Sequence, residues 1–178
     1  MVTKQNPVEK VKRFLEWLRS DKSISEYWRS WHKLRSALKR YKLSLADIGS
    51  SEEELEELKK NCQKMYAQKL VDSLRQDMEG YKVLVVSVVH ETRSFSQAMI
   101  NFNDSKNKVS QSWINEHKEA VAKLLSNLMA TKNDYYNHLE QLRNTLHERN
   151  LSLSECGTSE DELASFSKLL TQEHLMKV

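Results

Sequence analysis

The fold of this chain is decided by a stretch of sequence that occurs twice. Residues 34–55 read LRSALKRYKLSLADIGSSEEEL, and residues 142–163 read LRNTLHERNLSLSECGTSEDEL. The two copies are 108 residues apart, and a weaker copy fits halfway between them, because Tyr27, Tyr81 and Tyr135 align at a period of 54 residues. A period of this size is typical of stacked helical units, none of which buries its apolar face alone.

We therefore predict an all-α fold, an array of three helical-hairpin repeats in a single domain of 178 residues. The expected units are about 1–50, 51–104 and 105–158, and a C-terminal helix at 159–178 caps the array, which makes about seven helices. The chain contains one Pro and three Gly, so it has few residues that break helices. We expect these four residues at helix ends, and breaks near 49–51, 103–105 and 157–159.

Local signals place the individual helices. Their expected ranges are about 7–20, 24–42, 52–77, 80–102, 106–130, 133–149 and 160–176. Asn6 before Pro7 is typical of a helix start, and Ser51 with Glu54 predicts a capping box, in which side chains and backbone amides satisfy each other. Tyr27, Trp31, Leu34 and Leu38 form one apolar stripe with helical spacing.

The segment 83–89, VLVVSVV, is ambiguous when it is read locally. Its β-branched residues favour a buried strand. The repeat favours a helix instead, because these positions align with the helices expected at 24–42 and 133–149. We predict a helix there and keep a strand as the alternative.

The inventory of catalytic motifs is thin. The chain has no Gly-rich phosphate loop, no G-x-S-x-G elbow and no H-E-x-x-H motif, and its six His are scattered. We predict a protein that is not an enzyme and that has no catalytic residues, no metal site and no cofactor. Cys62 and Cys156 fall at apolar helix positions, so we expect buried, reduced thiols.

Charge is distributed unevenly along the chain. Residues 1–50 contain 12 Lys or Arg and 5 Asp or Glu, whereas residues 51–178 contain 16 and 20. Aromatic and cationic side chains interleave on the second expected helix, as an anionic partner requires. The candidate binding residues are Trp28, Arg29, His32, Lys33, Arg35, Lys39 and Arg40. The alternative is a solvated helix face without a ligand, and the return of Arg35 as Arg143 favours an architectural role for that residue.

The function expected from these features is a non-enzymatic protein–protein interaction or scaffolding module whose partner is another protein. Stacked hairpins offer an extended surface to a partner's helix or peptide. The alternative is a nucleic-acid-binding protein that uses the basic N-terminal helices, and an enzyme with an unrecognised helical site ranks third. The longest nearly apolar run, 83–89, is far too short to span a membrane, and no secretory signal is visible, so we expect a cytoplasmic protein without a membrane span.

Overall fold

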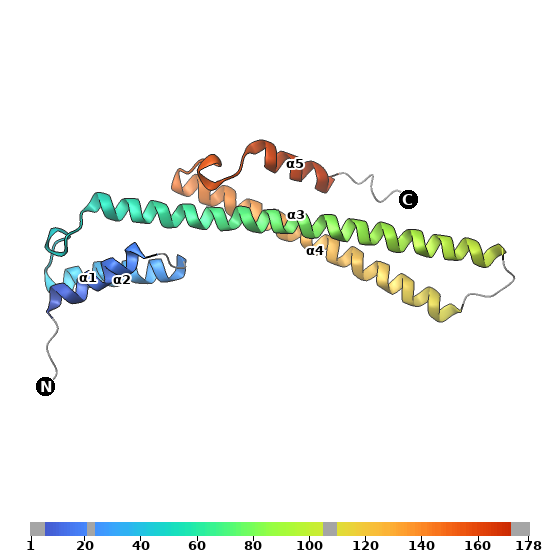
Figure 1. The fold of residues 1–178 in the computed structure, drawn as a ribbon, viewed down its shortest axis with the longest axis horizontal. Helices are drawn as coiled ribbons and strands as arrows, with labels where there is room; N and C mark the ends of the chain where they lie inside the picture. Colours follow the sequence, from blue (N-terminus) through green and yellow to red (C-terminus); the bar gives the residue numbers. More distant parts are fainter. Residues whose placement is uncertain (1–5, 21–23, 105–109, 172–178) are drawn as a thin grey trace, which may run out of the picture.

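A computed structural model of the chain describes residues 6–20, 24–104 and 110–171, and all regular structure in these ranges is helical. Five α-helices and two short 3₁₀ helices follow one another (Figure 1). They are α1 (Pro7–Arg19), α2 (Ile24–Tyr41), η1 (Ala46–Ile48), α3 (Glu52–Asp104), α4 (Gln111–Arg149), η2 (Ser154–Cys156) and α5 (Glu160–Thr171). The prediction of an all-α fold is therefore confirmed over the part of the chain that the structure describes.

The first core lies where α1, α2, η1 and the beginning of α3 meet, and we call this assembly the N-terminal module. Asn6 caps α1 as predicted, because its side chain accepts a hydrogen bond from the Val8 amide at 3.2 Å. The buried residues are Val11, Leu15, Leu18, Tyr27, Leu34, Ala37, Leu38, Ile48, Leu55 and Cys62. Trp31 is only partly buried, since its ring stacks on Tyr27 on one side and meets the Arg35 guanidinium at 5.1 Å.

A second core, the C-terminal module, joins the middle of α3, the later half of α4, η2 and α5. Its buried residues include Ala67, Leu70, Val71, Leu74, Met78, Tyr135, Leu139, Leu142, Leu151, Cys156, Leu163 and Leu170. In both modules two antiparallel helices are covered by a third helix that starts after a 3₁₀ turn. The repeated stretch forms the corner leading into that third helix, so it has the same role twice.

The two corners agree in atomic detail. Arg19 Nε donates to Glu54 Oε1 at 2.7 Å, and Arg75 Nε donates to Glu162 Oε1 at 2.8 Å. Each guanidinium also donates to the carbonyl of the glycine that ends the 3₁₀ turn, Gly49 or Gly157. The predicted capping box is half formed: Ser51 Oγ accepts from the Glu54 amide, but the Glu54 carboxylate binds Arg19 and Ser50 instead of its own cap.

The prediction of three hairpin repeats and about seven helices is wrong. Helices were expected to break near residues 78–80 and 131–133, yet α3 runs through Gly80 and α4 runs through Thr131 without interruption. A single Gly inside a helix costs only about 1 kcal/mol relative to Ala, and packing offsets that amount. The expected units 51–104 and 105–158 are therefore not two hairpins, because α3 and α4 are the two long arms of a single hairpin.

The middle copy of the repeat has a different origin, a heptad pattern. Apolar or half-buried positions recur at alternating steps of three and four along α3, at Ala67, Val71, Leu74, Met78, Tyr81, Val85, Val88, Thr92, Phe95 and Met99. The same spacing runs along α4, at Ile114, His117, Val121, Leu124, Leu128, Thr131, Tyr135, His138 and Leu142. This is the pattern of a coiled coil. Tyr81, Val85 and Val88 therefore aligned with other stripes because they are seam positions, not because they start a separate unit.

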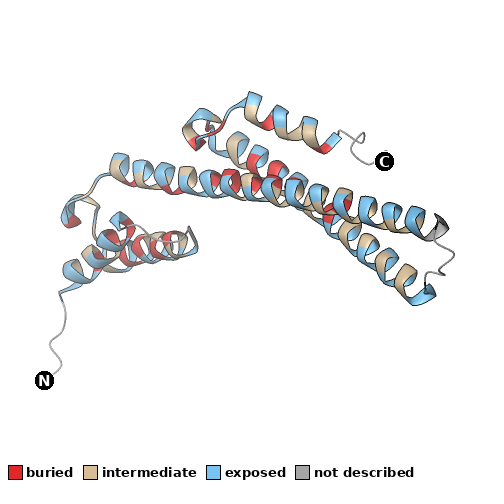
Figure 2. Ribbon diagram, turned by 45° about the vertical axis from the view of Figure 1, so that its right-hand side comes forward, coloured by how far each residue is buried: buried red, intermediate tan, exposed pale blue. Residues whose placement is uncertain are grey.

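Beyond the C-terminal module α3 and α4 continue as a pair, which we call the distal hairpin (residues 83–101 and 111–130). Buried residues gather in the two modules, whereas the distal hairpin consists mainly of half-buried and exposed residues (Figure 2). Residues 83–89 are helical, so the repeat predicted them correctly and the strand alternative is wrong. The ring of Phe95 stacks on Trp113 with centroids 5.7 Å apart, which ties the far ends of the arms together.

The remaining expectations concern helix ends. The breaks predicted at 49–51 and 157–159 are confirmed, and α3 ends at Asp104 next to residues 105–109, which lie outside the described ranges. The C-terminal helix begins as predicted at Glu160 and is described to Thr171, so its expected continuation to 176 falls outside them.

Candidate binding surface

The basic surface of the N-terminal module is formed by α1 and α2 together. Lys33 of α2 lines two adjoining crevices, one with Arg13, Phe14 and Trp17, the other with Lys10, Phe14 and Arg40. Phe14 lies at the centre of this arrangement because it belongs to both crevices. Cations alternate with aromatic rings on a surface of this type, which gives an anionic group both charge and a stacking platform.

The seven residues predicted from the sequence do not form one surface. Lys33 and Arg40 line the crevices shared with α1, and Arg29, His32 and Lys39 are exposed elsewhere on α2. Arg35 and Trp28 instead reach α3, because they lie on the side of α2 that packs against it. The seven residues therefore divide between different sides of α2, and the two that line the crevices do so together with residues of α1.

Arg35 is engaged in holding the fold. Its guanidinium donates to both oxygens of Glu52, at 2.9 and 2.7 Å. This bidentate hydrogen bond raises the pKa of Arg35 and lowers the pKa of Glu52. The architectural role suggested by its sequence repeat is thus the one the structure shows, and Arg35 does not join the basic crevices.

Trp28 lies in a crevice between three helices. Its neighbours there include Cys62 and Tyr66 of α3 and Arg149 at the end of α4. The indole also meets the Tyr27 ring edge-on, with centroids 5.6 Å apart. Trp28 therefore covers the junction of α2 with the two long helices.

The sequence indicated a basic surface on the N-terminal helices, but the candidate residues named from it all belong to α2. Lys10, Arg13 and Phe14 of α1 are the residues of the crevices that were missing from that set. The signal was present in the spacing, since Lys10, Arg13 and Phe14 share one face of a helix that buries Val11, Leu15 and Leu18 on the other.

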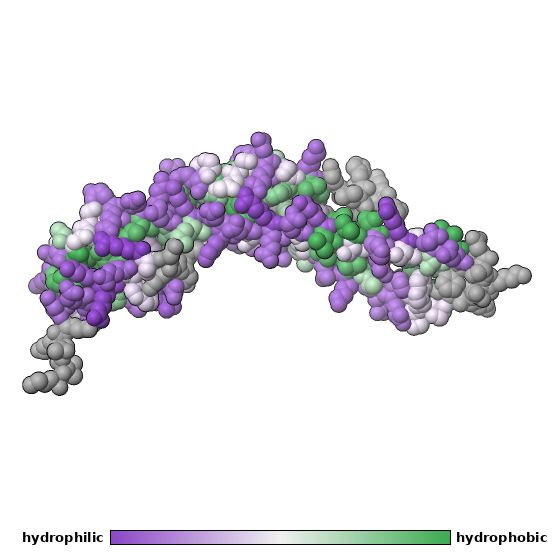
Figure 3. Space-filling view, in the orientation of Figure 1, coloured by the Kyte–Doolittle hydropathy of each residue, from purple (hydrophilic) through white to green (hydrophobic). Residues whose placement is uncertain are grey.

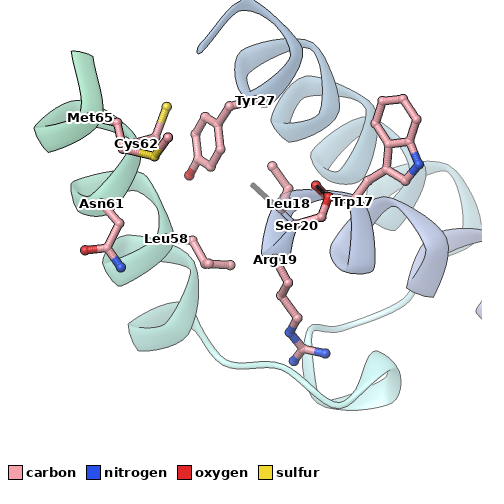
Figure 4. A pocket seen from close by; sticks show the side chains of 9 residues that line it. All are labelled: Trp17, Leu18, Arg19, Ser20, Tyr27, Leu58, Asn61, Cys62 and Met65. Atoms are coloured by element: carbon pink, nitrogen blue, oxygen red, sulfur yellow. Dashed lines mark hydrogen bonds between the residues drawn. The ribbon is translucent and has the colours of Figure 1, made fainter. Parts of the chain in front are cut away.

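Another crevice of the N-terminal module lies at the end of α1, with a volume of about 340 Å³. Figure 4 shows the Tyr27 ring directed from α2 toward Leu58 and Cys62 of α3, with Leu18 of α1 on the opposite side. Burial raises the pKa of Tyr27, and it also raises the pKa of Cys62. These groups are therefore neutral at physiological pH, and the crevice presents an apolar floor with a hydroxyl and a thiol.

Potential catalytic groups are few in the described residues. No group of three or more His, Cys, Asp or Glu there is arranged to hold a metal ion. Cys62 and Cys156 are both buried and free, as predicted, and burial raises the pKa of each thiol, which disfavours the reactive thiolate. His138 Nδ1 lies 2.7 Å from Asp77 Oδ2, and this pair joins α4 to α3 beside the coiled-coil seam.

The class defined by this geometry is an elongated all-α protein in which one long helix, α3, joins two small helical modules and then continues with α4 as an antiparallel coiled-coil hairpin. Comparison of the chain with protein-family models, with curated proteins and with solved structures finds no match. No helix in the described ranges is long and apolar enough to cross a membrane.

Proposed function

We propose that this protein is a non-enzymatic protein–protein interaction or scaffolding module. The observation that supports the proposal best is α3, one continuous helix of 53 residues, which measures about 80 Å at the usual rise per residue. The N-terminal module is built on its beginning, the C-terminal module on its middle and the distal hairpin on its end (Figure 1). A single helix of this kind holds three surfaces at set distances from one another, which is what a scaffold does.

Exposed apolar residues also support the proposal. Trp17 is 50% exposed on the N-terminal module, and Val86 and Met129 are each 68% exposed on the distal hairpin. Large exposed apolar side chains that occur in groups are typical of interaction surfaces. The cytoplasmic location expected from the sequence stays a prediction.

The test is affinity capture from the native host with the full chain as bait, analysed by mass spectrometry with and without nuclease. We expect co-purifying proteins whose recovery does not change on nuclease treatment or at 0.5 M salt, since apolar contacts are weakly salt-dependent. Recovery that disappears on nuclease treatment would contradict the proposal and favour nucleic-acid binding.

The alternative function, nucleic-acid binding, is favoured by one observation, the clustering of Lys10, Arg13, Lys33 and Arg40 around Phe14. The decisive experiment is binding of labelled RNA and DNA over a salt series. For duplex DNA each phosphate contact contributes about −0.9 to the log–log slope. The test variant is Lys33→Gln with Arg40→Gln, and its matched control is Arg29→Gln with Lys39→Gln, which removes the same charge from the same helix.

Under our proposal nucleic-acid binding at physiological salt is weak, and both double variants have the same affinity for nucleic acid as the unaltered chain. Salt-sensitive, submicromolar binding that only the Lys33 and Arg40 pair weakens would establish the alternative.

A further inference from the structure

The distal hairpin lacks the third helix that both modules possess. In the C-terminal module α5 covers α3 and α4, since Glu162 binds Arg75 and Phe166 meets the Tyr135 ring with centroids 6.4 Å apart. The described part of α5 ends at Thr171. No described helix covers the same side of the hairpin beyond that point, and Figure 3 shows apolar side chains gathered on the hairpin just past the end of α5.

The uncovered side can be traced residue by residue from the contacts of α5. Val86 and Val89 lie eleven and fourteen residues after Arg75, about three and four helical turns, so they share its side of α3. On α4, Leu125 lies fourteen residues before the buried Leu139 of the core shared with α5, and Met129 lies four residues after Leu125, on the same side of the helix. We call the surface of Val86, Val89, Leu125 and Met129 the open face.

The open face is bordered by cations. On α3, Lys82 precedes Val86 and Arg93 follows Val89 on the same side of the helix. On α4, Lys118 and Lys132 lie seven residues before and after Leu125. Lys82 pairs with Glu79, and the other three have no ion pair with any described residue. Acidic side chains occupy the opposite side of the hairpin, where Asp77 and Glu91 lie. The open face therefore combines an apolar centre with a positive border.

The chain itself shows what kind of element fits such a face. The helices that cover the two modules both begin with acidic residues, Glu52–Glu54 in α3 and Glu160–Glu162 in α5. In each case a glutamate binds an arginine of the helix pair beneath, and leucines of the covering helix are buried in the core. A helix with the same two features, apolar side chains to bury and acidic side chains to bind cations, is complementary to the open face.

We propose that the open face binds an amphipathic α-helix of a partner protein, one whose apolar stripe is flanked by Asp or Glu. This inference rests on the proposed function and names the chemistry of one partner. Charge complementarity selects this occupant, because a second copy of the face would bring four cations and one acid, Glu79, against the same set, so that repulsion outweighs attraction.

The experiment uses the full chain and a labelled synthetic helix of about 21 residues, with Leu along one stripe and Glu on both flanks. The control peptide has Lys in place of every Glu. The test variants are Val86→Asp in the centre and Arg93→Glu at the border. Ser87→Asp is the control for the first, since Ser87 is turned about 100° from Val86 and about 160° from Val89 around the same helix. Lys123→Glu is the control for the second.

We expect the acidic peptide to bind, the Lys peptide not to bind, and Val86→Asp and Arg93→Glu to weaken binding at least about tenfold. Ser87→Asp and Lys123→Glu should bind like the unaltered chain. Thermal melting of all four variants checks that the fold is retained, which their surface positions favour.

Several results would overturn the inference. Equal binding of the Lys peptide would show that charge does not select the partner. Equal loss of binding with Ser87→Asp would show that the peptide does not bind at the open face. Binding of vesicles that contain phosphatidylserine, lost with Val86→Asp while the acidic peptide does not bind, would assign the face to a membrane surface. A dimer in sedimentation that Val86→Asp abolishes would assign it to a second copy. Failure of the acidic peptide alongside nuclease-resistant protein capture refutes this inference and leaves the proposed function intact.

Discussion

The C-terminal module and the distal hairpin are formed by the same two helices, yet they differ in how completely their core is enclosed. In the module the seam residues Leu74, Met78 and Leu142 are each 0% exposed, because α5 and η2 cover the helix pair. In the distal hairpin Val88 and Leu128 are buried in the seam, but their neighbours Val85 and Leu124 remain half-buried, although the heptad spacing is unchanged. A coiled-coil pattern thus aligns two helices and buries part of their seam, and a third helix encloses the rest.

The largest expected effect is a difference between these two regions in the free energy of unfolding that is lost when a seam leucine is truncated. Leu142→Ala should lower the free energy of unfolding by about 2 to 5 kcal/mol, because it removes a fully buried side chain and leaves a cavity. Leu124→Ala, the corresponding change in the distal hairpin, should cost about 1 to 2 kcal/mol, since water already reaches part of the side chain. Urea denaturation of both variants measures the difference. Equal losses would show that the distal seam is as well enclosed as the module.

A smaller effect is expected at the two corners that the repeated sequence forms, where a glycine replaced by alanine should cost different amounts of stability. Gly49 and Gly157 have φ angles of 74° and 75°, which favour glycine, so an Ala at either position should destabilise by about 1 to 2 kcal/mol. A Cβ at Gly49 would meet nothing within 4 Å, whereas at Gly157 it would lie 3.1 Å from the Gln68 amide nitrogen. Gly157→Ala should therefore cost more than Gly49→Ala, and Gln68→Ala should remove the excess. The reverse order of the two costs would refute the corner geometry.

The smallest effect is a pH dependence that distinguishes Glu155 from Asp47, its counterpart in the other corner. Hydrogen bonds from the Ser152 amide and Lys64 are the leading causes that lower the pKa of Glu155 to about 2, and a hydrogen bond from the Ser44 hydroxyl lowers the pKa of Asp47. A depressed pKa contributes stability above the unfolded-state value, here 4.5 for Glu155, and this contribution is lost as the pH falls toward 2.

Carboxyl chemical shifts in an NMR titration report both groups directly. Lys60 and Lys64 lie 3.4 and 3.2 Å from Glu155, and no ion pair to Asp47 is present in the described residues. High salt should therefore raise the pKa of Glu155 more than that of Asp47. Glu155→Gln should flatten the fall of stability between pH 4.5 and 2. An ordinary pKa at Glu155 would show that η2 does not contact α3 as described.

The sequence allowed the corners to be predicted but not the long helices. The stretch at 34–55 and its copy at 142–163 carry caps, apolar spacing and a glycine for the turn, and local chemistry of this kind is readable without tertiary context. Gly80 misled the prediction, because a helix break and a tolerated glycine look alike in a single sequence. The continuity of α3 through 78–80 and of α4 through 131–133 depends on packing between the two helices, which a sequence period of 54 residues does not reveal.

The composition of the basic crevices could be read only in part from the sequence for a similar reason. Lys33 and Arg40 are among the candidate residues named from it, but the Lys10 and Arg13 that lie beside them come from another helix. Arg35 carries the same charge and is bound to Glu52, 17 residues away in sequence. A count of cations on one helix does not reveal which of them are paired.

Amide hydrogen exchange, measured by mass spectrometry or NMR on the monomeric chain, tests most directly whether the molecule consists of two enclosed modules and an open distal hairpin. Amides of residues 67–81 and 135–146 should exchange only through global unfolding, whereas those of 83–101 and 113–125 should exchange at least about 100-fold faster through local opening. Equal protection along the whole of α3 and α4 would contradict the account, because it would mean that the distal hairpin is enclosed as well as the C-terminal module.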